Sequence, residues 1–446
     1  MFTNRPAMKA EDPTRGLPAS DIPDQLESLK EDVYFIRDSI QKRLIADTNG
    51  DLSVSANDLK KMIEAYYTEL LSEKNLLYNR DTRVQMLDWV MADIIGYGPI
   101  EPLLNDEEIT EIMVNGHNNV YVERFGLIER TAVRFESDAH LRRIIDRIVA
   151  PIGRRVDESS PMVDARLPNG YRVNATIPPL SLDGPALTIR KFAVRPFTAQ
   201  DLIANGTLSV QLTHFLKACV EARVNLVISG GTGTGKTTLL NVLSTFIPIR
   251  ERILSIEDTA ELQLNQDHLV RLEKRPPNIE GKGEITIRQL VVNALRMRPD
   301  RIIVGECRSG EALDMLQAMN TGHDGSMTTV HANSPRDALR RVEIMVLMAG
   351  VELPLKAIRE QIASSIDLIV HIERLKDGTR KVVQVTEVQN MEADTIVLQD
   401  IFVFKQLGIK DGRVIGSLKS TGLRPNFAEK FRANSIEVSD SVYKTD

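Results

Sequence analysis

A glycine-rich octet near the middle of the chain could bind phosphate. Residues 230–237 read Gly-Gly-Thr-Gly-Thr-Gly-Lys-Thr and fit the pattern G-x-x-x-x-G-K-[ST]. Glycines let the backbone curl so that its N–H groups face phosphate oxygens, and Lys236 adds a positive charge for the β- and γ-phosphates. The Thr237 hydroxyl is the expected Mg²⁺ ligand. The residues predicted to contact a nucleotide here are Gly231, Thr232, Gly233, Thr234, Gly235, Lys236, Thr237 and Thr238.

The segments on both sides of this octet support the same interpretation. An apolar strand is predicted over residues 224–229 and a helix over residues 237–246, which is the context that a phosphate loop requires. A glycine-rich turn that arose by chance would not need a strand before it and a helix after it, so this alternative is disfavoured. GTPases, kinases, helicases and motors all use such a loop, so other residues must separate them.

Two acidic side chains follow apolar strands and could act on the γ-phosphate. Glu306 ends the run Arg-Ile-Ile-Val-Gly-Glu at 301–306, and it is expected to hold Mg²⁺ through water. Gly305 stands where many phosphate-loop proteins have the Mg²⁺-linked Asp. Glu257 follows the strand 253–256 and is the first choice for positioning the attacking water, although it could instead cap a helix N-terminus. The candidate catalytic residues are therefore Glu257, Glu306 and Lys236, and which acid positions the water stays open.

Two histidines lie eight positions apart in the segment 321–334. No cysteine or HxxxH helix pattern accompanies His323 and His331, so zinc binding is disfavoured. An imidazole at a strand end is suited to sensing the γ-phosphate and coupling hydrolysis to domain movement. We expect both histidines to contact the nucleotide.

The combination and order of these motifs resemble the hexameric secretion ATPases, most closely the CpaF/TadA branch of the Tad/Flp pilus systems. The resemblance covers roughly residues 84–420. It implies an α/β fold in which a RecA-like ATPase domain with a parallel-type sheet follows a smaller, PAS-like α/β domain and an N-terminal helical region. It also implies a homo-hexamer that couples ATP hydrolysis to pilus assembly or protein secretion, at the cytoplasmic face of inner-membrane platform proteins.

Arginines upstream of the phosphate loop extend the resemblance. The stretches 154–167 and 172–175 resemble the amino-terminal domain of CpaF-type ATPases, whose arginines reach the nucleotide. Arg166, Arg172 and Arg190 are therefore candidate γ-phosphate clamps, since guanidinium groups bind phosphate bidentately. The alternative is ordinary surface charge on a hairpin. Weaker candidates, for contacts across a subunit interface, are Arg271, Arg296 and Arg298.

The elements that must position these residues suggest four regions. They are a disordered tail at 1–24, a helical bundle at 25–83, an α/β domain at 84–208 that contributes the arginines, and a RecA-like ATPase domain at 209–446. In the α/β domain we expect strands at 109–114, 120–123, 132–135 and 186–192. A hairpin is expected where Asn169-Gly170 separates two extended runs.

Composition limits the alternatives. The net charge of −6 disfavours nucleic acid as the partner, and therefore a nucleic-acid-dependent motor. Without an Asn-Lys-x-Asp segment, a regulatory GTPase is also disfavoured. The two isolated cysteines cannot form the four-cysteine zinc module of many related pilus ATPases, so the resemblance leaves the Tad branch or the conjugative type IV secretion ATPases. No apolar segment reads as a leader or a membrane span, so we expect a cytoplasmic protein, peripheral at the inner membrane.

Overall fold

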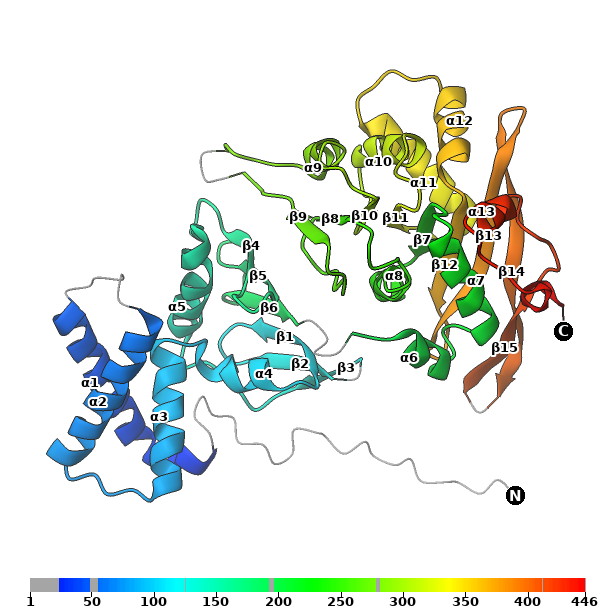
Figure 1. The fold of residues 1–446 in the computed structure, drawn as a ribbon. Helices are drawn as coiled ribbons and strands as arrows, with labels where there is room; N and C mark the ends of the chain where they lie inside the picture. The colour runs from blue at the N-terminus through cyan, green and yellow to red at the C-terminus, as the bar shows by residue number, and fades with distance from the viewer. Residues whose placement is uncertain are drawn as a thin grey trace, which may run out of the picture. The chain divides into compact units, whose positions relative to one another are not determined.

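The computed structural model describes residues 24–48, 55–124, 126–191, 196–277, 281–410 and 412–445. The tail expected at 1–24 lies outside these residues except for Asp24. The chain forms two compact units, Met1–Val194 and Arg195–Asp446 (Figure 1). This division precedes the expected boundary at 208/209 because Leu202 and Leu208 pack into the core of the second unit.

The first part of unit one is helical. A 3-10 helix η1 (Asp24–Leu29) leads into α1 (Lys30–Thr48), and α2 (Ala56–Glu73) and α3 (Arg80–Ile94) follow. The Ser55 hydroxyl caps α2 by accepting a hydrogen bond from the Asp58 N–H. The apolar side chains of these helices form one shared core, so the predicted N-terminal helical region is confirmed, and α3 extends it to Ile94.

The second part of unit one is an antiparallel sheet packed against a helix. The strand order is β3-β2-β1-β6-β5-β4. The elements are η2 (Gly98–Ile100), α4 (Glu101–Asn105), β1 (Ile109–Asn115), β2 (Val120–Arg124), β3 (Leu127–Arg130), α5 (Asp138–Val149), η3 (Ala150–Ile152), β4 (Met162–Arg166), β5 (Arg172–Thr176) and β6 (Ala186–Arg190). The apolar face of α5 and the inward residues of the strands share one core.

One strand prediction in this sheet was wrong. The strand expected at 132–135 is absent there, and β3 occupies Leu127–Arg130 instead. All four β3 residues are exposed, so they carry no alternating apolar signal. The apolar pattern at 132–135 instead reflects Phe135, which is buried in the core. The hairpin expected around Asn169-Gly170 is confirmed, with Arg166 opposite Arg172.

Unit two is built on a nine-stranded sheet of order β15-β14-β13-β12-β7-β11-β10-β8-β9. The six strands from β12 to β9 are parallel, and β13, β14 and β15 add antiparallel strands at one side. The strands are β7 (Leu226–Gly230), β8 (Ile253–Glu257), β9 (Leu269–Glu273), β10 (Arg301–Val304), β11 (Met327–His331), β12 (Leu368–Arg374), β13 (Arg380–Glu392), β14 (Thr395–Lys410) and β15 (Arg413–Ser420).

Helices cover both faces of this sheet. Leu226 and Ile228 of β7 belong to one core with α7 and α8, while Val227 between them belongs to a second core with α9 to α12. This alternation leaves β7 buried on both sides, as in a doubly covered α/β sheet. The helices are α6 (Ala199–Ala204), α7 (Val210–Glu221), α8 (Lys236–Ser244), α9 (Ile287–Ala294), α10 (Glu311–Asn320), α11 (Pro335–Met348), α12 (Leu355–Ser365), α13 (Ala428–Ala433) and η4 (Asp440–Tyr443). The α/β fold class is confirmed. Among the described residues, no helix has the length and apolarity needed to cross a membrane.

Candidate active site

The glycine-rich octet joins β7 to α8, as the sequence predicts. Gly230 is the last residue of β7, and Gly235 precedes the first residue of α8 with φ of 97°. A Cβ on Gly230 would lie 2.3 Å from the Ile372 carbonyl oxygen and 2.7 Å from the Thr234 hydroxyl oxygen. Only glycine therefore allows the loop to approach β12 this closely. The loop opens onto the N-terminus of α8, where backbone N–H groups attract anions.

Lys236 lies over the loop and is largely buried. Its Nζ donates to the Gly231 carbonyl oxygen at 2.8 Å, and both ring nitrogens of His331 lie 3.4 Å away. Burial lowers the pKa of the Lys236 ammonium, while the Glu306 carboxylate opposes that shift. Thr237 and Thr238 stand in the first turn of α8 and are half-buried, whereas Thr232 is exposed. The lysine is thus held beside the loop by groups that phosphate oxygens can replace.

Strand register brings the predicted acids to the same edge of the sheet as the loop. Gly230 of β7 is opposite His331 of β11, and Val304 of β10 is opposite Ile256 of β8. Glu257 is the last residue of β8, and Glu306 lies two residues after Val304, the last residue of β10. Because carboxyl ends of parallel strands share one edge, the loop, His331, Glu306 and Glu257 form a row in that order.

Glu306 is paired with two basic side chains. Its Oε1 lies 2.8 Å from His331 Nε2, and its Oε2 accepts from Arg308 Nε at 2.8 Å. Arg308 also reaches Asp258 at 3.3 Å, and Lys274 contacts Asp258 in turn. Burial lowers the pKa of the His331 imidazole, and the Lys236 charge lowers it further. His331 is therefore favoured as a neutral ring beside Glu306.

Glu257 is almost fully buried, at 3% exposure, and half of its carboxylate is already bonded. Its Oε2 accepts the backbone N–H groups of Glu261 and Leu262 at 2.6 and 2.8 Å. Residues 258–262 are not helical, so the helix-capping alternative is replaced by anchoring of a loop. Its Oε1 is buried without a hydrogen-bond partner among the described residues. Burial raises the pKa of this carboxyl group.

Gly305 is explained by Glu257. A Cβ at Gly305 would lie 3.0 Å from Glu257 Cγ, which is closer than side-chain carbons normally approach. An aspartate at this position would therefore displace Glu257. The acidic residue that follows β10 is therefore Glu306, one position after Gly305.

The two histidines lie at opposite edges of the sheet. His331 ends β11 beside Gly230, but His323 precedes Met327, the first residue of β11. Within this unit the structure does not bring His323 to the phosphate loop, because the segment 321–334 spans the whole strand, and its contact with the nucleotide stays a prediction. The His323 carbonyl oxygen instead accepts a hydrogen bond from Ser326.

Within unit one, the three predicted arginines lie side by side. Arg166 of β4 is opposite Arg172 of β5, and Arg172 is opposite Arg190 of β6. Residues directly opposite in an antiparallel sheet share a face, so these side chains form one row. Glu111 of β1 continues the row beyond Arg190. Three like charges in a row disfavour each other, and an anion bound across them would relieve that repulsion.

The structure also shows residues around the loop that sequence reasoning missed. Arg380, the first residue of β13, donates from Nε to the Gly233 carbonyl oxygen at 2.9 Å. His371 of β12 is buried, with Nδ1 2.9 Å from the Ser229 hydroxyl oxygen beneath the loop. Neither residue belongs to a motif, so local sequence gave no signal. Arg308 had a weak one, since it lies two positions after Glu306.

The weaker arginine candidates divide between the two edges of unit two. Arg271 of β9 donates to the Leu262 carbonyl oxygen at 3.0 Å and so supports the loop that Glu257 anchors. Arg296 and Arg298 are exposed in the segment between α9 and β10, which leads into the amino end of β10.

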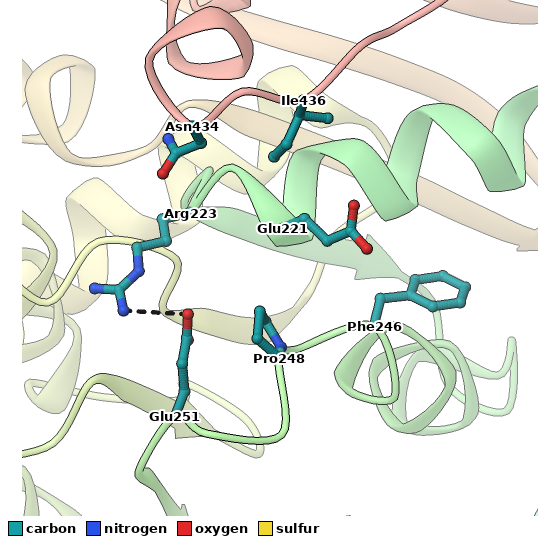
Figure 2. Close-up of a pocket in the computed structure, with 7 residues that line it drawn as sticks. All are labelled: Glu221, Arg223, Phe246, Pro248, Glu251, Asn434 and Ile436. Carbon is teal, nitrogen blue, oxygen red and sulfur yellow. Dashed lines mark ion pairs between the residues drawn. The ribbon is translucent and has the colours of Figure 1, made fainter.

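A pocket of about 700 Å³ lies at that amino edge, away from the phosphate loop (Figure 2). Arg223, which precedes β7, pairs there with Glu251, which precedes β8, at 3.1 Å. Figure 2 shows Phe246, Pro248 and Ile436 around the same hollow. It belongs to the opposite edge of the sheet and does not include the predicted site residues.

Comparison with known proteins shows the family of this chain. The model of the family described as "Type II/IV secretion system protein" matches residues 94–413, and that of "Type II secretion system protein E, N-terminal domain" matches residues 34–95. A putative conjugal transfer protein of Mycobacterium tuberculosis is 36% identical over 312 residues, which cover 68% of this chain and 87% of that protein. The type IV secretion system protein VirB11 of Bartonella henselae is 32% identical over 326 residues, covering 64% of this chain and 90% of that protein.

A solved structure, the VirB11 ATPase of the Brucella suis type IV secretion system in complex with sulphate, is 30% identical. It covers 65% of this chain and 92% of that chain, with a TM-score of 0.36. The family match spans most of the chain and includes the phosphate loop, Glu257, Glu306 and both histidines. The chain therefore belongs to the type II/IV secretion system protein family.

Proposed function

We propose that this protein is an ATP hydrolase that binds Mg²⁺-ATP at the carboxyl edge of the sheet in unit two. The observation that carries the proposal is the continuous set of contacts from Lys236 through His331 to Glu306 beside the phosphate loop. Lys236 and the loop N–H groups would bind the β- and γ-phosphates. Thr237, and Glu306 through water, would hold Mg²⁺, which neutralises charge on the transferred phosphoryl group.

We assign the positioning of the attacking water to Glu257. Its Oε2 is fixed by two backbone N–H groups, so the orientation of the carboxylate is set before substrate arrives. Its Oε1 is left to accept a proton or a hydrogen bond. Glu306 is instead shared between Arg308 and His331. A raised pKa also makes Glu257 a stronger base than an ordinary surface carboxylate.

His331 is the proposed γ-phosphate sensor. His331 contacts Lys236, which is proposed to bind phosphate, and Glu306, which is proposed to hold the metal. When the γ-phosphate leaves and water takes its place, both contacts would change. The arginine row of unit one is the proposed clamp on the γ-phosphate. Its support is the register that gathers the three guanidinium groups, together with the resemblance to CpaF-type ATPases.

We further propose a homo-hexamer that acts on an inner-membrane platform in the assembly of a Tad/Flp-type pilus or in protein secretion. The support is the motif resemblance and the family to which the chain belongs. Conjugative secretion is a second candidate, because one relative is named a putative conjugal transfer protein and another belongs to a type IV secretion system. We place the protein in the cytoplasm, peripheral at that membrane.

The test is ATP turnover by purified full-length protein. Lys236→Ala and Glu306→Ala should each abolish turnover while the circular dichroism spectrum stays that of the parent protein. Undiminished hydrolysis by Lys236→Ala would overturn the site assignment. Strong stimulation of hydrolysis by DNA or RNA, with steep salt dependence, would instead support a nucleic-acid motor.

A further inference from the structure

The β14–β15 hairpin extends past the rest of the sheet in unit two (Figure 1). The pairing of β13 with β14 runs from Glu392 opposite Thr395 to Gln384 opposite Val403. From Phe404 to Lys410, β14 pairs with β15, which is the outermost strand of the sheet. We call residues 403–410 and 412–419 the ribbon. Its outer end, from Lys405 to Lys410, is exposed at every position.

Register places the basic side chains of the ribbon on one face. Lys410 is opposite Arg413, Lys405 is opposite Ser417, and Val403 is opposite Lys419. Alternate residues of β15 point to the same side, and a shift between Gln406 and Gly408 keeps β14 in phase with them. One face therefore carries Lys405, Lys410, Arg413 and Lys419.

The ribbon also carries apolar side chains. Phe404 is opposite Leu418 on the other face, and its ring lies over Gly416, where a Cβ would approach within 2.5 Å of it. Farther out, Leu407, Ile409 and Ile415 are 78%, 57% and 42% exposed. Large aliphatic side chains at the end of a two-stranded ribbon are costly to leave in water.

A hydrogen bond joins the ribbon to the turn between β12 and β13, just before the residue that contacts the phosphate loop. Asp377, in the turn between β12 and β13, accepts the Val414 N–H at 2.8 Å. Three residues later, Arg380 bonds the Gly233 carbonyl oxygen. The ribbon is therefore anchored at its side to the same edge of the sheet that carries the phosphate loop.

We propose that the ribbon docks on an anionic phospholipid surface. Residues 403–419 contain four basic side chains and one acidic residue, Asp411, in a chain whose net charge is −6. A basic face attracts anionic headgroups, and two exposed aliphatic side chains, Leu407 at the shift and Ile415 on the same face as Arg413, can enter the boundary between headgroups and acyl chains. The proposal deepens the peripheral membrane location given above, on which it rests, by naming the element that makes the contact.

The exposed side chains favour a lipid surface over nucleic acid. Single-stranded nucleic acid is bound by basic grooves that also offer aromatic rings for base stacking. The one aromatic side chain of the ribbon, Phe404, covers Gly416 and is half-buried. Aliphatic side chains beside lysines instead match the pairing of apolar insertion and Coulomb attraction at a membrane surface.

The experiment is cosedimentation of the full-length, nucleotide-free protein with vesicles. Vesicles of phosphatidylcholine alone are compared with vesicles that also contain phosphatidylglycerol. Each basic side chain near an anionic surface contributes about fivefold in partitioning, so Lys405→Gln/Lys410→Gln/Arg413→Gln should weaken binding on the order of a hundredfold. Leu407→Ser/Ile415→Ser should weaken binding to the same vesicles, because it removes the exposed aliphatic side chains on the basic side of the ribbon. The matched control, Lys60→Gln/Lys61→Gln/Lys356→Gln, removes the same charge from exposed helical positions and should bind as the parent protein does.

Equal binding of the parent protein to neutral and anionic vesicles would overturn the proposal, as would equal loss in the control. Binding to DNA or polyglutamate without binding to vesicles would also overturn it, and would assign the ribbon to another partner. Absence of any binding would leave the lysines as charges that keep edge strand β15 from pairing with other chains, and would refute the membrane role. ATP hydrolysis measured without lipid reports separately on the proposed function.

Discussion

Glu257 anchors the loop 258–262 and is proposed to position the attacking water. We therefore expect two substitutions at this position to separate its effect on stability from its effect on catalysis. Glu257→Gln keeps an oxygen that can accept the N–H groups of Glu261 and Leu262, but it removes the negative charge. Glu257→Ala removes both acceptors, so the buried Leu262 N–H and the part-buried Glu261 N–H lose this carboxylate. Since an unsatisfied buried donor costs about 1–3 kcal/mol, we expect Glu257→Ala to lose about 1–3 kcal/mol of folding free energy at Leu262 and a smaller amount at Glu261.

The pKa direction gives the sign of the effect of Glu257→Gln on stability. Burial raises the folded-state pKa of Glu257, so ionisation of this group near neutral pH opposes folding. Stability from Glu257 is fully present below its unfolded-state pKa and is lost as pH rises through the folded-state pKa. We therefore expect Glu257→Gln to be at least as stable as the parent protein at neutral pH. The advantage of the Gln variant should shrink as the pH falls.

Both variants should lose hydrolysis to a similar extent. Loss of a group that positions or deprotonates the attacking water costs about 10²–10⁴-fold in kcat. The assays are steady-state ATP turnover and thermal unfolding of nucleotide-free protein, where a loss of a few kcal/mol lowers Tm on the order of 10 °C. Parent-like turnover in Glu257→Gln would refute the catalytic role and transfer it to Glu306. If Glu257→Gln had a Tm as low as that of Glu257→Ala, the loop-anchoring role of Glu257 would be refuted.

Four further substitutions, one of them a control, test neighbouring parts of the site. Gly305→Ala should lower kcat about tenfold to a hundredfold with KM for ATP little changed, because the new Cβ displaces Glu257; steady-state kinetics with varied ATP distinguishes the two constants. His331→Ala should slow turnover at least tenfold, whereas His323→Ala at the other edge should stay within about twofold; comparable losses in both would contradict the placement of His323. Arg380→Ala should raise KM for ATP severalfold, because it frees the Gly233 carbonyl from its bond; an unchanged nucleotide affinity by titration would count against that contact.

Local motifs predicted the parts of this site that are continuous in sequence. The strand, loop and helix around Lys236 follow from one octet and its apolar neighbours, and their geometry is as expected. Contacts between distant segments could not be predicted in this way. Arg380 is 147 positions from Gly233, and Arg308 is 50 positions from Asp258. Only the sheet order β12-β7-β11-β10-β8 brings such residues to one edge.

The wrong strand prediction and the unequal placement of the two histidines have the same physical origin. A sequence segment such as 321–334 gives both of its histidines equal weight, but a parallel strand carries its two ends to opposite edges of the sheet. The segment 132–135 looks like a strand because Phe135 is apolar, yet that ring serves the core of unit one. In both cases the sequence pattern identified residues of a suitable type, but tertiary packing decided where those residues lie.

Gly305 shows how packing can explain a motif that sequence alone can only describe. The glycine marks a departure from the usual metal-linked aspartate, and its cause lies on the adjacent strand. Val304 pairs with Ile256, so the residues that follow them, Gly305 and Glu257, are neighbours at the carboxyl edge. The Glu257 side chain fills the space that a side chain at 305 would need. An acidic residue at the end of β10 must therefore lie one position later, at 306. There the Glu306 carboxylate pairs with both His331 and Arg308.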